Sequence, residues 1–441
     1  MTARQISRRS LLGALMGTAA ALPLLAACGN RGGGGGTGDV RFEGWDYEPP
    51  LVEKNLATFA QKHPDIKVQY TPITSAQYRQ KVVAEFTAKN GPDALYVYDD
   101  SLGTWVESGY LQPIDGLPGV DEVYKGIYDA NAKAMTYKGK RYGLPYYTDC
   151  LGLIYNAEIL DKAGIKAPPK SLDELEQQAL TIKSKGLLPF PIAFSAQLQD
   201  TWQSWIWTLV YGSGGDLFSD DMKPVMDGVD PIPGQTYEWL HRASTQSKVV
   251  DPASLQLTPV PLDNAMKAGQ YAFIFGTRYS LKDYNNPSTS KMAGKLKIAP
   301  VPSLDGSVKG TAGNTRLYCL AADTKVKDQA MTLLNFLGGY TDGQPATARY
   351  WFMERGLGFA FKELEKDKQI TDTLATFVDP GVYAQLASVA KARNVVHAPW
   401  YAEFESALQK TTQQVITDQT TPAAAMTALA TAANDLTKKY S

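Results

Sequence analysis

Cysteine and histidine are scarce in this chain of 441 residues, which contains three of each. The histidines are scattered at His63, His241 and His397, so no metal site with clustered ligands is expected. The chain also lacks a Gly-x-Ser-x-Gly elbow, a His-Glu-x-x-His helix and a phosphate-binding Gly-Lys-Ser loop. These absences argue against the common hydrolases, metalloproteases and nucleotide-binding enzymes. We therefore expect neither catalysis nor a cofactor.

Neither sign of charge dominates, because 44 Lys and Arg residues face 45 Asp and Glu residues. Such a balance, without a basic patch, argues against a nucleic acid partner. Aromatic side chains are plentiful instead, with 24 Tyr, 14 Phe and 8 Trp. Tyr and Trp combine an apolar ring with a polar tip, which suits half-wet surfaces on which a ligand can stack.

The apolar stretch at 11–25 is shorter than the roughly 20 residues that a membrane span needs, and it is rich in Ala and Gly. It follows three arginines and ends in small residues before Cys28. This order predicts a removable export signal over residues 1–27, and a membrane-spanning anchor is the less favoured alternative.

Two details of this segment predict its fate. The sequence SRRSLL at 7–12 resembles a twin-arginine signal, although Sec export stays open, and LAAC at 25–28 resembles a lipobox. Cleavage before Cys28 would leave a thiol that carries a lipid anchor. Residues 28–39 are mostly Gly and predict a flexible tether. We expect the mature protein to sit on the extracytoplasmic face of the cytoplasmic membrane.

After Cys28 only Cys150 and Cys319 remain. In an exported chain the two could form a disulfide bond. The alternative is that both are small buried apolar side chains.

The mature body of about 400 residues predicts two domains. Short apolar runs at 40–42, 66–70 and 94–98 predict strands, and the stretches at 49–60 and 78–86 have helical periodicity. A β-α-β-α-β order implies a parallel sheet with right-handed crossovers. Ligands of such sheets lie beyond the carboxyl ends of the strands.

The alternation continues through the second half of the chain. Strands are expected at 153–155, 271–275 and 315–320. Ser171 and Glu174 form the capping box of a helix, and Pro422 opens the last helix.

Six segments in this order resemble the bacterial extracellular solute-binding protein family 1, and in particular its maltose and maltodextrin branch. Each segment is weakly specific alone, but their order along nearly the whole mature chain is specific for the family. The matching segments are GPDALY at 91–96, GYLQPI at 109–114, KGKRYGLP at 138–145 followed by LIYN at 153–156, PPKSLDEL at 168–175, GGDLF at 214–218 and KAGQYA at 267–272.

The resemblance implies an α/β, two-lobed periplasmic-binding-protein fold of type II. Each lobe is expected to have a mostly parallel sheet flanked by helices. Lobe 1 would hold residues 40–146 and 313–350, and lobe 2 residues 150–310 and 356–441. The hinge crossings would lie near residues 145–150, 308–314 and 348–358. Family members close over a ligand by a hinge motion.

Candidate ligand residues follow the ends of the expected strands. Trp45 and Tyr47 come after the first strand, and Asp99 and Asp100 end the third. Aromatic rings can cover the apolar face of a sugar, and carboxylates can bond its hydroxyl groups. The alternatives are a lid over a helix start for the rings and helix capping for the acids.

The resemblance adds candidates by position. Asp100 and Asp149 fall where the family has acidic ligand contacts, although Asp149 could instead make a hinge hydrogen bond. Trp400, followed by Tyr401, falls where a family Trp stacks on a sugar ring. Trp202 lies in a region that offers a further aromatic wall.

One departure from the family pattern concerns the ligand. Many relatives have Gly-x-Trp where this chain has Gly276, Thr277 and Arg278, followed by Tyr279. Arg278 is a permanently charged donor. It could bond ligand hydroxyls or an acidic sugar, or it could form a salt bridge to an acid of the cleft.

The sequence thus predicts the binding subunit of an ABC importer. It would capture a mono- to oligosaccharide and deliver it, as a monomer, to the transmembrane permease subunits. A binding protein for a sugar acid, a sugar phosphate or a glycerophosphodiester is the alternative. A carbohydrate-active enzyme, which needs an acid and a base about 5–10 Å apart, is the less favoured reading.

Overall fold

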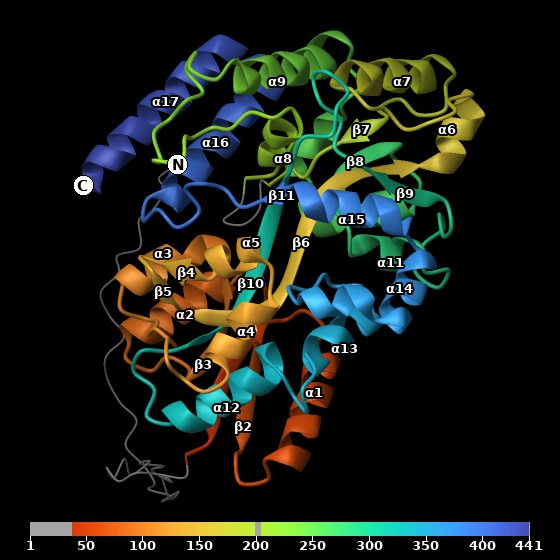
Figure 1. The fold of residues 1–441 in the computed structure, drawn as a ribbon. Coiled ribbons are helices and arrows are strands. Elements are labelled where there is room, and N and C mark those ends of the chain that lie inside the picture. Colours follow the sequence, from red (N-terminus) through yellow and green to blue (C-terminus); the bar gives the residue numbers. More distant parts are fainter. Residues whose placement is uncertain (1–37, 199–203, 441) are drawn as a thin grey trace, which may run out of the picture. The chain divides into compact units, whose positions relative to one another are not determined.

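The computed structural model describes residues 38–198 and 204–440. The predicted leader, Cys28, nearly all of the tether and Trp202 lie outside the described residues. Helices and strands alternate along the chain (Figure 1).

The strands contribute to one large sheet and one small hairpin. In chain order they are β1 (Val40–Trp45), β2 (Val68–Ile73), β3 (Ala94–Tyr98), β4 (Thr136–Tyr137), β5 (Lys140–Arg141), β6 (Gly143–Asn156), β7 (Ile192–Ala193), β8 (Phe273–Thr277), β9 (Leu296–Ala299), β10 (Thr311–Leu320) and β11 (Ala390–Lys391).

The α-helices range from short connecting turns to the long C-terminal pair. They are α1 (Pro49–Lys62), α2 (Tyr78–Thr87), α3 (Asp99–Glu107), α4 (Val120–Gly126), α5 (Asp129–Ala134), α6 (Ala157–Ala163), α7 (Leu172–Ser184), α8 (Ser204–Gly212), α9 (Pro231–His241), α10 (Pro259–Lys267), α11 (Ser280–Tyr284), α12 (Lys327–Gly338), α13 (Ala346–Arg355), α14 (Lys368–Ala375), α15 (Pro380–Val389), α16 (Tyr401–Ile416) and α17 (Pro422–Lys439).

The N-terminal part confirms the expected β-α-β-α-β unit. Strand β1 pairs in parallel with both β2 and β3. Helix α1 begins with Pro49 and Pro50, which suit a first helical turn because their missing N–H groups would have no partner there. The carboxyl ends of β1 and β3 therefore lie at the same edge of the sheet.

The large sheet has the strand order β2-β1-β3-β10-β6-β8-β7, with β11 beside β10 and β9 beside β6. Its parallel pairs are joined through the two long strands β6 and β10. These strands lie side by side and antiparallel (Figure 1), with Asn314 opposite Asp149 and Thr315 opposite Thr148. A register shift between Arg316 and Leu317 bends the pair at this point.

Two hydrophobic cores flank the β6–β10 pair. Strand β6 contributes Ile154 to the first core and Leu151 and Leu153 to the second. The first core also contains Phe42, Tyr96, Tyr146 and Tyr318, and the second contains Trp205, Trp207, Trp239 and Phe404. Two cores joined by shared strands fit the expected α/β class, while the exact lobe boundaries stay a prediction.

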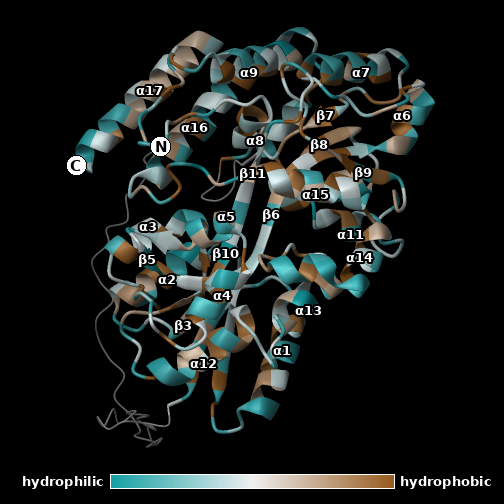
Figure 2. Ribbon diagram, viewed as in Figure 1, coloured by the Kyte–Doolittle hydropathy of each residue, from teal (hydrophilic) through white to brown (hydrophobic). Residues whose placement is uncertain are grey.

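Helix α7 illustrates how the sequence determines a surface helix. The Ser171 hydroxyl accepts a hydrogen bond from the backbone N–H of Glu174 at 3.0 Å, which confirms Ser171 as the N-cap. The Glu174 carboxylate reaches back one residue further than in the expected capping box and accepts from the backbone N–H of Lys170 at 2.7 Å. The inner face of α7 buries Leu172, Leu175 and Ile182, while the other side is charged. Figure 2 shows this mixture of hydrophobic and hydrophilic residues on α7 and on α17.

Cys150 and Cys319 are both free and buried, so they do not form the disulfide that the sequence left open. The Cys150 thiol instead lies 3.6 Å from the carbonyl oxygen of Leu386. Among the described residues, no helix has the length and apolar character needed to cross a membrane.

Two helical glycines differ in their surroundings, and this difference is testable. A Cβ atom on Gly103 of α3 would lie 2.0 Å from the carbonyl oxygen of His397, whereas one on Gly234 of α9 would meet only a side chain at 4.0 Å. We expect Gly234→Ala to raise the free energy of unfolding by about 0.5–1 kcal/mol, because Ala is the better helix former.

In contrast, Gly103→Ala should lower the free energy of unfolding, because the clashing atom belongs to the backbone. Denaturant unfolding of both variants beside the parent chain measures the two effects. Equal stabilisation by both substitutions would contradict the close approach of α3 to His397.

Candidate functional site

A cavity of about 240 Å³ opens where strands of both cores meet. We call it the aromatic cavity, because rings form much of its wall. The rings belong to Trp45, Tyr47, Tyr98, Tyr147, Phe275 and Tyr279. Polar side chains complete the lining, namely Ser75, Ser195, Asp263, Thr277 and Arg316.

The fold explains why these residues meet. Trp45 ends β1 and Tyr98 ends β3, so both lie at the carboxyl edge where the sequence predicted a ligand. Tyr147 belongs to β6, where it lies opposite Arg316 of the neighbouring strand β10. Thr277 ends β8, and Tyr279 immediately precedes α11. Residues distant in the sequence are thus gathered around one small space.

The rings already hold one another in place. The rings of Trp45 and Tyr98 stack with centroids 4.3 Å apart and an interplanar angle of 25°. Tyr279 lies edge-on to Tyr47 at 6.4 Å and to Tyr147 at 6.2 Å. Because packing fixes these rings, they offer flat apolar faces at little further entropic cost.

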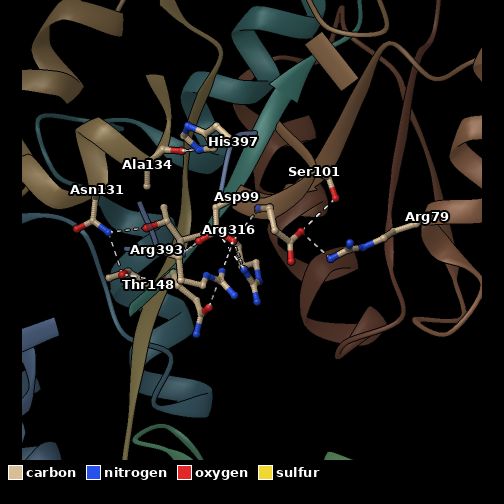
Figure 3. Close-up of polar contacts among 12 residues, drawn as sticks. Arg79, Asp99, Ser101, Asn131, Ala134, Thr148, Arg316, Arg393 and His397 are labelled. Atoms are coloured by element: carbon tan, nitrogen blue, oxygen red, sulfur yellow. Dashed lines mark hydrogen bonds and ion pairs between the residues drawn. The ribbon is translucent and has the colours of Figure 1, made fainter. Parts of the chain in front are cut away.

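Asp99 is buried and serves as an anchor for arginine. Its carboxylate accepts hydrogen bonds from Nη1 of Arg316 at 2.8 Å and from the backbone N–H of Thr315 at 2.8 Å (Figure 3). Nη2 of Arg393 lies 3.6 Å from the same carboxylate. Asp99 therefore joins α3 to β10, and it does not line the aromatic cavity.

Asp100 points to a different partner. Its carboxylate accepts hydrogen bonds from Arg79 at 2.7 Å and from the Ser101 hydroxyl at 3.2 Å (Figure 3). Burial tends to raise the pKa of Asp100, but Arg79, Arg393 and Arg316 outweigh it and hold that pKa below its ordinary value. The structure places Asp100 outside the lining of the aromatic cavity.

Asp149 and Arg278 form the salt bridge that the sequence left as one alternative. Arg278 Nε donates to Asp149 at 2.8 Å, and the backbone N–H of Tyr279 donates to the same carboxylate at 3.1 Å. Burial raises the pKa of Asp149, although Arg278 opposes the rise. The Arg278 guanidinium lies 4.0 Å above the ring of Tyr383.

This salt bridge lines a second space of about 600 Å³, which we call the crossing cavity. Its wall combines residues of β6 and β10 with apolar residues of α13, α14 and α15, such as Phe352, Leu374 and Ala384. Arg278 and Tyr279 are neighbours in sequence, yet they line different cavities.

Trp400 and Tyr401 lie in the second core. Trp400 is 5 % exposed and packs against Phe218 at 5.5 Å and Phe404 at 6.3 Å. Neither residue lines the aromatic or the crossing cavity. Of the sequence-predicted ligand residues, the structure thus brings Trp45, Tyr47 and Tyr279 together.

Sequence reasoning missed most of the other lining residues, among them Tyr98, Tyr147, Asp263 and Arg316. Tyr98 directly precedes Asp99 and Tyr147 lies two residues before Asp149, so their nearness in sequence to acids already considered was a usable signal. Asp263 lies on α10, where it accepts a hydrogen bond from the Tyr284 hydroxyl, and nothing local marks it. Burial raises the pKa of Asp263 to about 6.

Comparison with known proteins identifies the family. The sequence model of the bacterial extracellular solute-binding protein family matches residues 45–343. The chain belongs to this family. Family members are binding proteins, and the match confirms the resemblance seen in the sequence.

Two curated relatives align with most of this chain. The diacetylchitobiose-binding protein DasA of Streptomyces coelicolor is 26 % identical over 342 residues, which are 74 % of this chain and 77 % of DasA. An uncharacterised lipoprotein of Streptomyces antibioticus is 25 % identical over 341 residues, which are 72 % of this chain and 70 % of that one.

Solved structures confirm the fold. Maltose-bound MalE3 of T. maritima superposes with a TM-score of 0.77 at 20 % identity, covering 90 % of this chain and 99 % of MalE3. A solute-binding protein of Thermotoga lettingae with bound α-D-tagatose superposes with a TM-score of 0.76 at 24 % identity, covering 90 % of this chain and 98 % of that protein. A solute-binding protein of Agrobacterium vitis with bound D-mannitol superposes with a TM-score of 0.72 at 17 % identity, covering 91 % of this chain and 98 % of that protein. The α/β fold is thus that of the two-lobed binding proteins.

The burial of Trp400 separates two roles for this residue. If it packs only in the second core, Trp400→Ala should lower the free energy of unfolding by about 3–5 kcal/mol, the usual cost of emptying a large aromatic site. Denaturant unfolding measures this loss, and Trp400→Phe is the matched variant that keeps a ring. Full stability combined with lost ligand binding would instead support the stacking role predicted from sequence.

Proposed function

We propose that this chain is the solute-capturing subunit of an ABC importer and that it binds a small carbohydrate or sugar alcohol in the aromatic cavity. The observation that carries the proposal is the aromatic cavity itself. It combines flat rings with a few polar groups at the carboxyl edge of β1 and β3.

The chemistry of the wall suits a polyhydroxylated ligand. A sugar has an apolar C–H face that a ring can cover, while its hydroxyl groups reach the polar side chains at the edge. The cavity volume of about 240 Å³ lies below the roughly 300–1,000 Å³ of drug-sized sites. This size favours a monosaccharide or polyol over a long oligosaccharide, and maltose, tagatose and mannitol in similar folds support the class.

Capture works through a shift between conformations. The ligand touches residues of both cores, so it favours the closed arrangement by its differential affinity. We propose the lobes predicted from sequence, residues 40–146 with 313–350 and residues 150–310 with 356–441, as the moving bodies. Closure then presents one surface from both lobes to the transmembrane permease subunits.

Catalysis has no support in the arrangement of acids. A glycosidase needs an acid and a base that face one bond, whereas the described lining of the aromatic cavity contains a single carboxyl group, that of Asp263. Asp99, Asp100 and Asp149 lie outside this lining, and each accepts a hydrogen bond from an arginine. We therefore propose a binding protein without enzymatic activity.

We also propose the location predicted from sequence. Residues 1–27 direct export, by a twin-arginine-like signal, and Cys28 carries the lipid that holds the monomeric protein at the extracytoplasmic face of the membrane. The lipoprotein among its relatives supports this placement. Metabolic labelling with a radioactive fatty acid, with Cys28→Ala as control, tests the anchor.

A binding screen tests the proposed function directly. The full chain is titrated by calorimetry with monosaccharides, sugar alcohols and maltodextrins, and each ligand is recovered and analysed afterwards. We expect saturable binding of one small neutral compound that is recovered intact. Cleavage of the ligand, or no binding by any compound, would overturn the proposal.

The rings should supply much of the affinity. Tyr279→Ala removes one wall of the aromatic cavity and should weaken binding about tenfold or more, since a well-placed aromatic contact contributes about 1 kcal/mol beyond its buried area. Tyr155, a half-buried tyrosine of β6 that lines neither cavity, is the matched control. Calorimetry of Tyr155→Ala should give the parent affinity, and equal losses in both variants would argue against a ring-lined ligand site.

A further inference from the structure

Asp100 lies outside the lining of the aromatic cavity, yet it reaches a ring of the cavity wall through one intermediate residue. Its carboxylate accepts a hydrogen bond from Arg79 at 2.7 Å (Figure 3). The guanidinium carbon of Arg79 in turn lies 4.5 Å from the centre of the Tyr98 ring. Because Tyr98 lines the aromatic cavity, a row of three contacting residues joins an acid of α3 to the wall of the proposed ligand site.

The fold brings these three residues together from neighbouring elements. Tyr98 is the last residue of β3, and Asp100 follows it in the first turn of α3. Arg79 is the second residue of α2, so its side chain approaches from a separate helix. The side chains of Arg79 and Asp100 are only 20 % and 12 % exposed. Water and salt therefore screen their attraction less than that of a fully exposed ion pair.

The Tyr98 ring is a central member of the wall. Trp45 stacks on it with centroids 4.3 Å apart, and Tyr78 lies edge-on to it at 6.4 Å. Arg316 also lies over this ring, with its guanidinium carbon 4.7 Å from the ring centre. Burial raises the pKa of the Tyr98 hydroxyl, and Arg316 and Arg79 both oppose that rise. Two guanidinium groups from different elements thus act on one ring.

Arg79 has the chemistry needed to hold a ring. A guanidinium is planar and permanently charged, so it is attracted to the face of an aromatic ring while its N–H groups remain available to a carboxylate. Asp100 supplies that carboxylate through a charge-assisted hydrogen bond. Burial tends to raise the pKa of Asp100, but Arg79, Arg393 and Arg316 hold this pKa below its ordinary value, so the acid stays ionised at neutral pH.

We propose that Arg79 is a positioning residue for ligand binding: anchored by Asp100, it fixes the Tyr98 ring, and with it the stacked Trp45, as a preformed wall of the aromatic cavity. The inference rests on the proposed function, and it gives Asp100 a role at this site without a ligand contact. A ring that is already ordered adds little entropic cost when a ligand binds, whereas a released ring must be ordered at that moment.

The order of the rings can be measured without a ligand. The full chain is labelled with fluorotryptophan, and Trp45→Phe assigns the fluorine NMR resonance of Trp45. Arg79→Met removes the charge and the planar group but keeps a long side chain. It should broaden or shift the Trp45 resonance, because Trp45 stacks on the Tyr98 ring that would be released. An unchanged resonance would overturn the proposal.

Arg141 offers a matched control at another ring. Its guanidinium carbon also lies 4.5 Å from the centre of a tyrosine ring, that of Tyr124, and its Nη1 donates to Asp121 at 2.5 Å. These three residues belong to the described lining of neither cavity. Arg141→Met should leave the Trp45 resonance at its parent position. An equal change in both variants would reveal a general effect of losing such a contact and would contradict the proposal.

A second variant removes the anchor instead of the ring contact. Asp100→Asn keeps the shape of the side chain and takes away its charge. It should change the Trp45 resonance in the same direction as Arg79→Met, but to a smaller extent. An unchanged resonance in Asp100→Asn would disprove the anchoring by Asp100, and this variant decides alone if Arg79→Met does not fold.

A double substitution separates an effect through Tyr98 from a direct one. Tyr98→Leu removes the ring, so adding Arg79→Met to it should not change the Trp45 resonance any further. A merely structural ion pair between α2 and α3 would not show this dependence on the ring. Changes of equal size with and without the Tyr98 ring would mean that Arg79 acts by another route, and the proposal would be wrong.

Calorimetry then measures whether the fixed ring matters for the ligand. The probes are maltose, D-tagatose and D-mannitol, which solved structures of similar fold contain. Arg79→Met should weaken binding of a probe that the parent chain takes by about two- to tenfold, the usual cost of ordering one side chain. Arg79→Lys, which keeps the charge, should recover part of the loss.

Two outcomes of the calorimetry separate this inference from the proposed function. An Arg79→Met affinity equal to that of the parent chain would overturn the positioning role and leave the proposed function standing. No binding of any probe by the parent chain would overturn the proposed function, and the Trp45 resonance would still decide whether Arg79 holds the ring.

Discussion

The pairing of β6 with β10 is the constraint on which the rest of the structure depends. The two strands are the only long ones in the described sheet, and side chains of β6 enter both cores. Polar groups reinforce the pair where it passes between the cores. The Thr311 hydroxyl donates to the carbonyl of Leu151 at 2.6 Å, and the Asn131 amide donates to Thr148 and Thr315 at 2.9 Å each. Satisfied polar contacts of this kind fix one register.

The buried arginines follow from this geometry. Both cavities lie beside the β6–β10 pair, which connects the two cores. Buried charged side chains of this region, such as Arg278 and Arg316, therefore line cavities and are shielded from bulk water. A buried ion pair contributes little net stability, because desolvation offsets its attraction. Asp99–Arg316 and Asp149–Arg278 are therefore better explained as devices that fix positions. Each holds a guanidinium at the wall of one cavity.

Local patterns allowed much of the fold to be predicted. The alternation of apolar runs gave the β1–α1–β2–α2–β3 unit, and the capping box at Ser171 and the proline at Pro422 gave helix starts that the structure confirms. Trp45 and Tyr47 could be placed at the site because they follow a strand end. Ligands of parallel sheets lie beyond the carboxyl ends of the strands, so this prediction requires only that the strand and its parallel neighbours be recognised.

The remaining site residues depend on contacts that no local pattern contains. Arg278 and Tyr279 are adjacent, but the chain turns between β8 and α11, so their side chains enter different cavities. Asp263 and Arg316 reach the aromatic cavity only through the packing of α10 and β10. Trp400 matched a family position, yet Phe218 and Phe404 enclose it in the second core. Sequence position alone does not decide whether a ring faces a ligand or a core.

The two arginine–aspartate pairs show why charge by itself does not mark a binding site. Both have the same length of 2.8 Å and both are buried. Arg278 faces a larger cavity, whose wall mixes apolar helical residues such as Phe352 and Leu374 with polar residues such as Asn131 and Glu365. Arg316 faces a smaller cavity, whose wall contains stacked rings, hydroxyl groups and the carboxyl group of Asp263. The surroundings of a charge, more than the charge, therefore determine what it can recognise.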